Sequence, residues 1–233
     1  MAVISGKFRS GFAEVINGTS GNDTIFPLGG WDTVNGGGGI DTLVISDKRA
    51  NFSISADANL SYVDAISGAS GQSDMTTLNS VERVAFNDGL SVALDTGIKQ
   101  AGGQTALLLG AVLGQPALAA KKPLVGTVIA LFDQGFTLKD LSGAVMRLDI
   151  WGLLANGGNA SASNTQIANY LLTTVNKAAP SATTLAAAVT ALDSQTGAAQ
   201  GDFLAALAQS AANQVQVGLV GLAQSGLAYT DIV

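Results

Sequence analysis

The spacing of apolar residues changes once along this chain of 233 residues, close to Gly97. Over residues 51–95, apolar and polar residues alternate in short runs separated by Gly, Asn, Asp and Ser, which is typical of half-buried strands. Beyond Gly97, apolar residues recur at helical spacing, as at Leu185, Val189 and Leu192. The pattern therefore predicts a strand-rich N-terminal part followed by a helical part.

Four strands and a tight turn are predicted in the alternating part. Asn87, Asp88 and Gly89 have the composition of a hairpin turn. The predicted strands are residues 52–55, 62–66, 81–86 and 90–94.

Helix starts in the second part are marked by capping residues. Thr137 is followed by Asp140 in the first turn, Ser163 and Gln166 fit a capping box, and Pro123 suits a first helical turn. We expect a bundle of six or seven short helices, covering residues 105–113, 124–134, 138–155, 166–176, 184–194, 203–209 and 215–224.

Before the alternating region, residues 18–44 contain a repeat of nine residues. Written in nines from Gly18, the chain reads GTSGNDTIF, PLGGWDTVN and GGGGIDTLV. Glycine, aspartate, threonine and an apolar residue recur in columns four, six, seven and eight. The aspartates are Asp23, Asp32 and Asp41. One degenerate repeat precedes these three, over residues 10–17, with Glu14 in the aspartate column.

This pattern resembles the calcium-binding nonapeptide of the RTX family, G-G-x-G-x-D-x-U-x. The resemblance implies a short roll in which loops alternate between two edges, so that loops two repeats apart stack. The fold class that we expect is α+β as separate domains. Residues 1–97 would form the calcium-binding β-roll and β-sheet domain, and residues 98–233 a helical bundle with a secretion-signal-like tail.

The family pattern implies a calcium site between the loops of Asp23 and Asp41. Calcium accepts carboxylate and backbone carbonyl oxygens together, and glycine allows the tight turns that expose those carbonyls. Asp32 and Glu14 would form a weaker second position, because Pro27 and Leu28 replace glycines there. The remaining residues assigned to the metal sites are Gly18, Gly21, Asn22, Gly36 and Gly39. A glycine-rich loop with surface aspartates and no metal is the alternative.

Two further segments resemble parts of secreted bacterial proteins. Residues 78–89, LNSVERVAFNDG, are similar to a segment that follows RTX repeats in type I secreted proteins. Residues 203–214 are similar to the closing helices of a helical module of unassigned function, found behind RTX segments in secreted and surface-layer-type proteins. The last residues, YTDIV, resemble the uncleaved tail of type I secretion substrates.

The amino-acid composition excludes several classes of function. The formal charge is −6, and eleven of the seventeen acidic residues fall within residues 1–100, so a nucleic-acid partner is not expected. The chain has neither histidine nor cysteine, which removes the commonest general base, zinc ligands and thiol nucleophile, and we predict that it is not an enzyme. No apolar run approaches about 18 residues, so no transmembrane segment is expected.

We expect an extracellular or cell-surface protein, exported by type I secretion machinery without a cleavable N-terminal signal peptide. Calcium is the expected cofactor. Few charges and many small polar residues favour a structural protein that self-associates into a surface layer, filament or matrix, with a cell-surface glycan or lipid as a further partner. The alternative is a secretion and folding module of a larger type I secreted enzyme or adhesin. An enzyme with an unrecognised active site ranks third.

Overall fold

The computed structural model describes residues 1–7, 13–56, 61–65, 75–159, 161–194 and 200–230. It divides into two compact units. The sheet unit contains residues 1–103, 121–127 and 220–233, and the helical unit contains residues 104–120 and 128–219. The predicted α+β class, with a strand-rich N-terminal region followed by a helical region, is confirmed.

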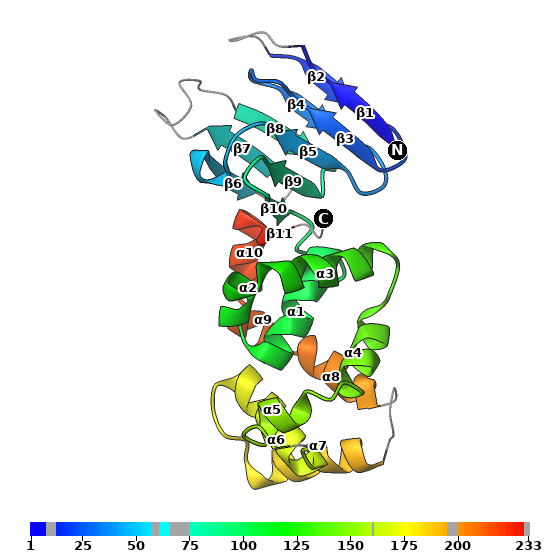
Figure 1. The fold of residues 1–233 in the computed structure, drawn as a ribbon, viewed down its shortest axis with the longest axis vertical. Coiled ribbons are helices and arrows are strands. Elements are labelled where there is room, and N and C mark those ends of the chain that lie inside the picture. The colour runs from blue at the N-terminus through cyan, green and yellow to red at the C-terminus, as the bar shows by residue number, and fades with distance from the viewer. Residues whose placement is uncertain (8–12, 57–60, 66–74, 160, 195–199, 231–233) are drawn as a thin grey trace. The chain divides into compact units, whose positions relative to one another are not determined.

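The sheet unit contains two sheets (Figure 1), and the chain alternates between them from β1 to β5. One sheet has the strand order β1-β3-β5-β9-β10-β11, and the other β2-β4-β8-β7-β6. The strands are β1 (Ala2–Ser5), β2 (Val15–Asn17), β3 (Asp23–Phe26), β4 (Thr33–Asn35), β5 (Thr42–Ile45), β6 (Phe52–Ala56), β7 (Ser61–Ala65), β8 (Met75–Asn79), β9 (Arg83–Phe86), β10 (Leu90–Ala93) and β11 (Leu227–Thr230).

The repeats build the parallel half of both sheets. β1, β3, β5 and β9 pair in parallel, as do β2, β4 and β8. The apolar column of the repeat faces inward, and Ile25, Val34 and Leu43 are fully buried. The core continues through Leu78 and Val84, which occupy the same column one layer beyond the repeats. A one-residue slip would turn this column outward, so the core fixes the register.

The predicted strands are present with small shifts. β9 and β10 form the antiparallel hairpin expected around Gly89, and β6 and β7 form a second hairpin. β8 was not predicted. The predicted lead-in at residues 10–17 and the predicted strand at 62–66 extend beyond the described residues at 10–12 and 66.

The C-terminal end differs from the prediction of a boundary near residue 97. β11 pairs antiparallel with β10, from Leu90 opposite Thr230 to Ala93 opposite Leu227, and so belongs to the sheet unit. Leu227 and Tyr229 are buried in it. The last three residues of the secretion-signal-like tail, 231–233, lie outside the described residues.

Ten α-helices are described, besides a short 3-10 helix at Arg49–Asn51, against six or seven helices predicted. The predicted helix at 138–155 is divided into two helices, and the predicted helix at 215–224 covers the end of one helix and most of the next. The short helix α2 was not predicted. The helices are α1 (Ala101–Leu113), α2 (Pro116–Ala120), α3 (Lys122–Asp133), α4 (Leu138–Met146), α5 (Trp151–Ala155), α6 (Asn164–Asn176), α7 (Ala182–Asp193), α8 (Gln200–Ala208), α9 (Ala211–Gln216) and α10 (Leu219–Ser225).

Capping explains where these helices begin. Thr137 and Asp140 form a complete capping box on α4, and Ser163 and Gln166 form one on α6. Ser181 caps α7 through the backbone N–H of Thr184. Within the described part of the chain, no helix is both long enough and apolar enough to span a bilayer.

Candidate metal centre

The two aspartates predicted to share an ion lie side by side. β3 and β5 pair in parallel with Thr24 opposite Thr42, which places Asp23 and Asp41, the residues before them, in neighbouring layers. We call this side of the roll edge A. Both aspartates are buried, at 2% and 0% exposure.

A chain of hydrogen bonds links the layers along edge A. The backbone N–H of Ala2 donates to Oδ1 of Asp23 at 2.8 Å, and that of Asp23 donates to Oδ1 of Asp41 at 2.8 Å. The N–H of Asp41 then donates to Oε2 of Glu82 at 2.9 Å. Each carboxylate therefore accepts the backbone N–H of the layer before it.

The two aspartates differ in what satisfies their second oxygen. Oδ2 of Asp23 accepts the backbone N–H of Thr19 at 2.5 Å, and the Thr19 hydroxyl donates to Oδ1 at 3.1 Å. The Thr19 backbone hydrogen bond is the main reason why the pKa of Asp23 is lowered. By contrast, Oδ2 of Asp41 is buried with no hydrogen-bond partner among the described residues.

Burial raises the pKa of Asp41, and the neighbouring Asp23 charge adds to that rise. The pKa of Glu82 is also raised, mainly by burial and further by the charge of Asp41. A cation beside Asp41 would supply both a partner for the unpaired oxygen and the missing counter-charge. The carboxylates of edge A therefore fit a calcium ion.

Glycines allow the loops of edge A to stack closely. A methyl group on Gly18 would overlap the carbonyl oxygen of Gly36, and one on Gly37 would overlap the carbonyl oxygen of Thr19. Gly37 also has a φ of 105°, which disfavours any side chain. Such stacking brings backbone carbonyl oxygens next to the aspartates, the mixed oxygen set that calcium accepts.

Asn22, Gly21 and Gly39 lie at the contact between the same two loops. The amide oxygen of Asn22 accepts the backbone N–H of Ile40 at 3.0 Å, so it links the loops. A methyl group on Gly39 would lie 2.7 Å from that oxygen and 2.8 Å from the carbonyl carbon of Gly21. These residues hold the two loops together, and their role as ligands stays a prediction.

On the opposite side of the roll, edge B, the predicted pair also meets. The backbone N–H of Glu14 donates to Oδ1 of Asp32 at 3.1 Å. However, the Glu14 carboxylate accepts the N–H of Lys7 at 2.6 Å, and the next layer offers the uncharged Thr76. Leu28 adopts a φ of 65° in this loop, a conformation that favours glycine. Edge B therefore stacks two acidic residues, Glu14 and Asp32, whereas edge A stacks three, Asp23, Asp41 and Glu82.

Sequence reasoning missed Glu82 and the carbonyl of Ser80 as parts of edge A. The pairing of β5 with β9 places Thr42 opposite Arg83, so Glu82 occupies the aspartate position of the next layer. The signal in the sequence is the order acid, any residue, apolar, apolar. It occurs in Asp41–Val44 and again in Glu82–Ala85, but out of the nine-residue frame.

No group of three or more acidic, histidine or cysteine side chains within the described ranges forms a metal-binding cluster. A calcium ion on edge A would therefore combine one or two carboxylates with backbone carbonyl oxygens. Calcium tolerates this combination, whereas a zinc site would require nitrogen or sulfur ligands that the chain lacks.

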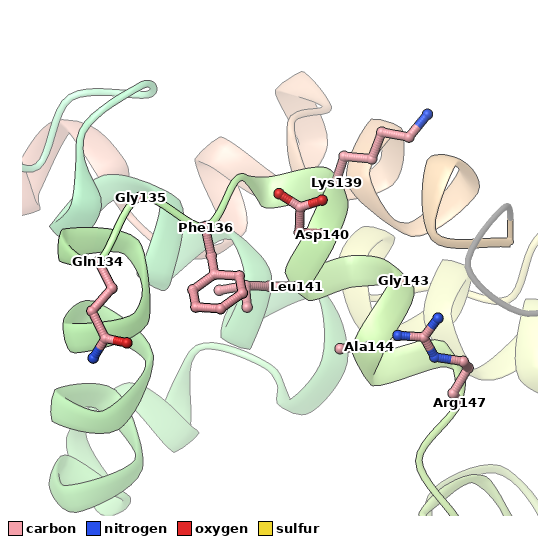
Figure 2. A pocket seen from close by; sticks show the side chains of 9 residues that line it. All are labelled: Gln134, Gly135, Phe136, Lys139, Asp140, Leu141, Gly143, Ala144 and Arg147. Atoms are coloured by element: carbon pink, nitrogen blue, oxygen red, sulfur yellow. The ribbon is translucent and has the colours of Figure 1, made fainter.

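A pocket of about 580 Å³ in the helical unit offers a second concave surface, between the end of α3 and α4. Figure 2 shows Phe136 and Leu141 among its lining side chains. Two of its three charged lining residues have structural roles, because Asp140 caps α4 and Lys139 pairs with Asp202 at 2.8 Å; the third is Arg147. The pocket presents no arrangement of nucleophile and base.

Comparison with known proteins supports the assignment of edge A. Residues 9–43 match the family model described as RTX calcium-binding nonapeptide repeat (4 copies). The matched range includes the degenerate repeat around Glu14. No curated protein matches the chain.

Among solved structures, the chain matches the crystal structure of the extracellular lipase LipA from Serratia marcescens at 18% identity and a TM-score of 0.20. The match covers 32% of this chain and 13% of the lipase chain. Such a low TM-score transfers neither fold nor activity. RTX repeats indicate an extracellular protein of the type I secreted kind. The chain thus carries RTX calcium-binding nonapeptide repeats at its N-terminal end, and calcium is the ion that they bind.

Proposed function

We propose that this chain is a secreted structural protein whose roll folds when calcium binds outside the cell, and which then associates with further copies. The observation that carries the calcium-dependent step is Asp41, which is fully buried with an oxygen that lacks a hydrogen-bond partner in the described structure. An isolated buried charge is costly, so the folded roll needs a cation there.

Calcium concentration would control this step. Free calcium in the cytoplasm is too scarce to fill sites of the weak-affinity class, whereas sites of about 10⁻⁴ to 10⁻³ M fill outside the cell. Without the ion, the stacked carboxylates of Asp23 and Asp41 repel one another. Because the site exists only in the folded roll, binding free energy becomes folding free energy.

The first layer of the roll supports self-association. β1 and β2 are edge strands of the two sheets, and both belong to this layer. Val3 and Val15 on these strands are 72% and 64% exposed. Unpaired edge strands with apolar side chains and little charge are favourable surfaces for pairing with another chain. A second copy could therefore continue both sheets, as in a filament, matrix or surface layer.

A structural role also fits the available chemistry, and we propose that the chain is not an enzyme. It lacks histidine and cysteine, and two of the charged residues around the pocket near Phe136, Asp140 and Lys139, serve helix capping and an ion pair. These observations favour binding and assembly over catalysis.

The test is the mass of the purified chain by light scattering and its appearance by electron microscopy, as calcium is added. We expect ordered polymers with calcium and monomers with magnesium or chelator. The double variant Val3→Lys/Val15→Lys should stay monomeric, because lysine blocks edge pairing. Val215→Lys, at an 82% exposed position of α9, is the matched control.

A wild-type chain that remains monomeric at saturating calcium would overturn the assembly proposal. That result would favour a secretion and folding module of a larger protein. Polymers that form equally well with lysine on β1 and β2 would place the association elsewhere.

A further inference from the structure

The acidic column of edge A continues one layer beyond the nonapeptide repeats. Glu82 lies outside residues 9–43, the matched range, yet it occupies the position that Asp41 holds in the layer before. It accepts the backbone N–H of Asp41 at 2.9 Å, as Asp41 accepts that of Asp23 at 2.8 Å. A hairpin insertion separates Glu82 from the repeats in sequence, and the sheet brings it back.

The surrounding oxygens repeat with the same spacing. A methyl group on Gly18 would overlap the carbonyl oxygen of Gly36 and lie 3.0 Å from Oδ2 of Asp23. One on Gly36 would overlap the carbonyl oxygen of Ser80 and lie 2.5 Å from Oδ2 of Asp41. Each layer therefore sets a carbonyl oxygen of the next loop beside the carboxylate of its own loop.

Of the two aspartates, Asp41 has the carboxylate that a bound cation would stabilise more. Oδ2 of Asp23 is satisfied by Thr19, whereas Oδ2 of Asp41 has no hydrogen bond within the described ranges. The nearby Arg83 is directed to Asp95, with an Nη1 to Oδ1 distance of 2.5 Å. In the described part of the chain, neither Asp41 nor Glu82 forms an ion pair, although the charge of Arg83 acts to lower the pKa of Glu82 against the larger effect of burial.

We propose that Asp41, the carbonyl of Ser80 and Glu82 form a further calcium position at the last layer of the roll. This inference rests on the proposed function, because it extends the calcium-dependent folding of the repeats to a segment outside them. The oxygens of Asp41 and Ser80 both border the space that a methyl group on Gly36 would occupy. Both could therefore reach one ion with bonds of about 2.3–2.6 Å. Glu82 completes the site with a second carboxylate.

Such an ion would couple the repeats to the rest of the sheet unit. It would tie the loop of Gly36–Asp41 to the start of β9, and β9 pairs with β10. Calcium binding at the N-terminal repeats would thus order strands that contain no repeat sequence.

The first experiment compares calcium stoichiometry by titration calorimetry and equilibrium dialysis in the full chain. Glu82→Gln keeps an oxygen for the Asp41 N–H but loses the charge. We expect it to bind one calcium fewer than wild type, or to bind one ion at least tenfold more weakly. Asp88→Asn is the matched control, since its carboxylate accepts the N–H groups of Arg49 and Leu90 and contributes none of the hydrogen bonds along edge A.

Unchanged stoichiometry and affinity in a folded Glu82→Gln variant would overturn the inference. If wild type binds no calcium at about 10 mM, far above the weak-affinity range, the proposed calcium-dependent folding itself fails. If calcium binds and one ion is lost in Glu82→Gln but no polymer forms, the site stands and the assembly proposal fails.

A second experiment does not depend on whether Glu82→Gln folds. Wild-type crystals grown with a lanthanide would be searched for anomalous scattering peaks. We expect a peak within about 2.3–2.6 Å of both Asp41 Oδ2 and a Glu82 oxygen. Peaks confined to the loops of residues 18–23 and 27–32 would exclude the proposed position.

Discussion

The two units differ in the charge of the polar groups that they bury. In the sheet unit, the buried acids Asp23 and Asp41 stack in neighbouring layers, and one oxygen of Asp41 has no hydrogen bond in the described structure. In the helical unit, the buried amide of Asn213 donates to the carbonyls of Leu107 and Ala208 at 2.8 and 2.7 Å. The first arrangement leaves a buried charge that an ion from solution would balance, whereas the Asn213 amide has its partners within the chain. The buried groups without a hydrogen bond in the described part of the helical unit, Thr105 Oγ1 and Ser142 Oγ, are neutral hydroxyls.

This contrast shows how one chain can combine a conditional fold with an unconditional one. Buried charges without a counter-charge cost free energy, whereas neutral groups with hydrogen bonds are tolerated. The helical unit also has its own start signals, such as the capping boxes of α4 and α6. Calcium should therefore govern one unit and leave the other almost unaffected.

The largest expected effect is that of chelation. Removing calcium should loosen residues 14–95 and leave helices such as α6 largely intact, because no described residue of the helical unit is a buried, unpaired charge comparable to Asp41. Hydrogen exchange measured by mass spectrometry would locate the segments that lose structure, and circular dichroism would measure the loss of strand content. The same melting curve with and without chelator would contradict the comparison.

A destabilising substitution in the helical unit should have the same effect with and without calcium. Asn213→Ala leaves two carbonyls without their donor and should lower the free energy of unfolding of the helical unit by about 2–3 kcal/mol. Chemical denaturation in calcium and in chelator should give the same loss. Val215→Ala, at an exposed position of the same helix, should cost little. A calcium-dependent loss in Asn213→Ala would mean that the units are coupled.

Acid should partly replace calcium in the roll. The pKa values of Asp41 and Glu82 are raised from 3.8 and 4.5, so folding favours their protonated forms. That stabilisation is complete below those ordinary values and is lost as the pH rises through the raised pKa values. In chelator, strand signal should therefore increase as the pH falls from 7 toward about 4.

The trend should reverse at lower pH. The pKa of Asp23 is lowered, so its stabilising effect is present above 3.8 and lost as the pH falls through the lowered pKa. Asp41→Asn should weaken the gain on acidification and serves as the control. Strand content that falls steadily from pH 7 would refute this account. The helical unit should show no such gain.

The smallest expected effect comes from backbone conformation. Leu28→Gly should stabilise the roll by about 0.5 kcal/mol, since relief at a φ of 65° exceeds the entropy cost of glycine. The gain should be measurable in calcium, where the roll is folded. Lys177→Gly, at a φ of 56° after α6, should give a similar gain in either condition. Equal gains for both variants in chelator would show a roll that folds without calcium.

Periodicity in the sequence predicted the inner parts of the fold and site. A nine-residue repeat on two alternating sheets returns the chain to the same edge after eighteen residues, which is the separation of Asp23 and Asp41. The apolar column that forms the core follows from the same count. The capping residues likewise predicted the starts of α4 and α6.

Long-range pairing lay beyond this reasoning. The β6–β7 hairpin interrupts the count of nine before β8 and β9, so the place of Glu82 depends on sheet register and not on local spacing. The return of β11 to β10 has no periodic signal at all, because the two strands are far apart in sequence. The sequence also contains little indication of where two predicted helices are interrupted. Residues 147–150 contain no glycine or proline, and residues 217–218 contain only Gly218.

The return of β11 makes the helical unit an insertion between two neighbouring strands. Joining the ends of a flexible segment of more than a hundred residues costs on the order of 4 kcal/mol in chain entropy. A helical unit that folds first would hold the ends of that segment at a fixed separation before the strands pair. In this way helices that bind no metal would favour closure of the sheet through chain connectivity alone.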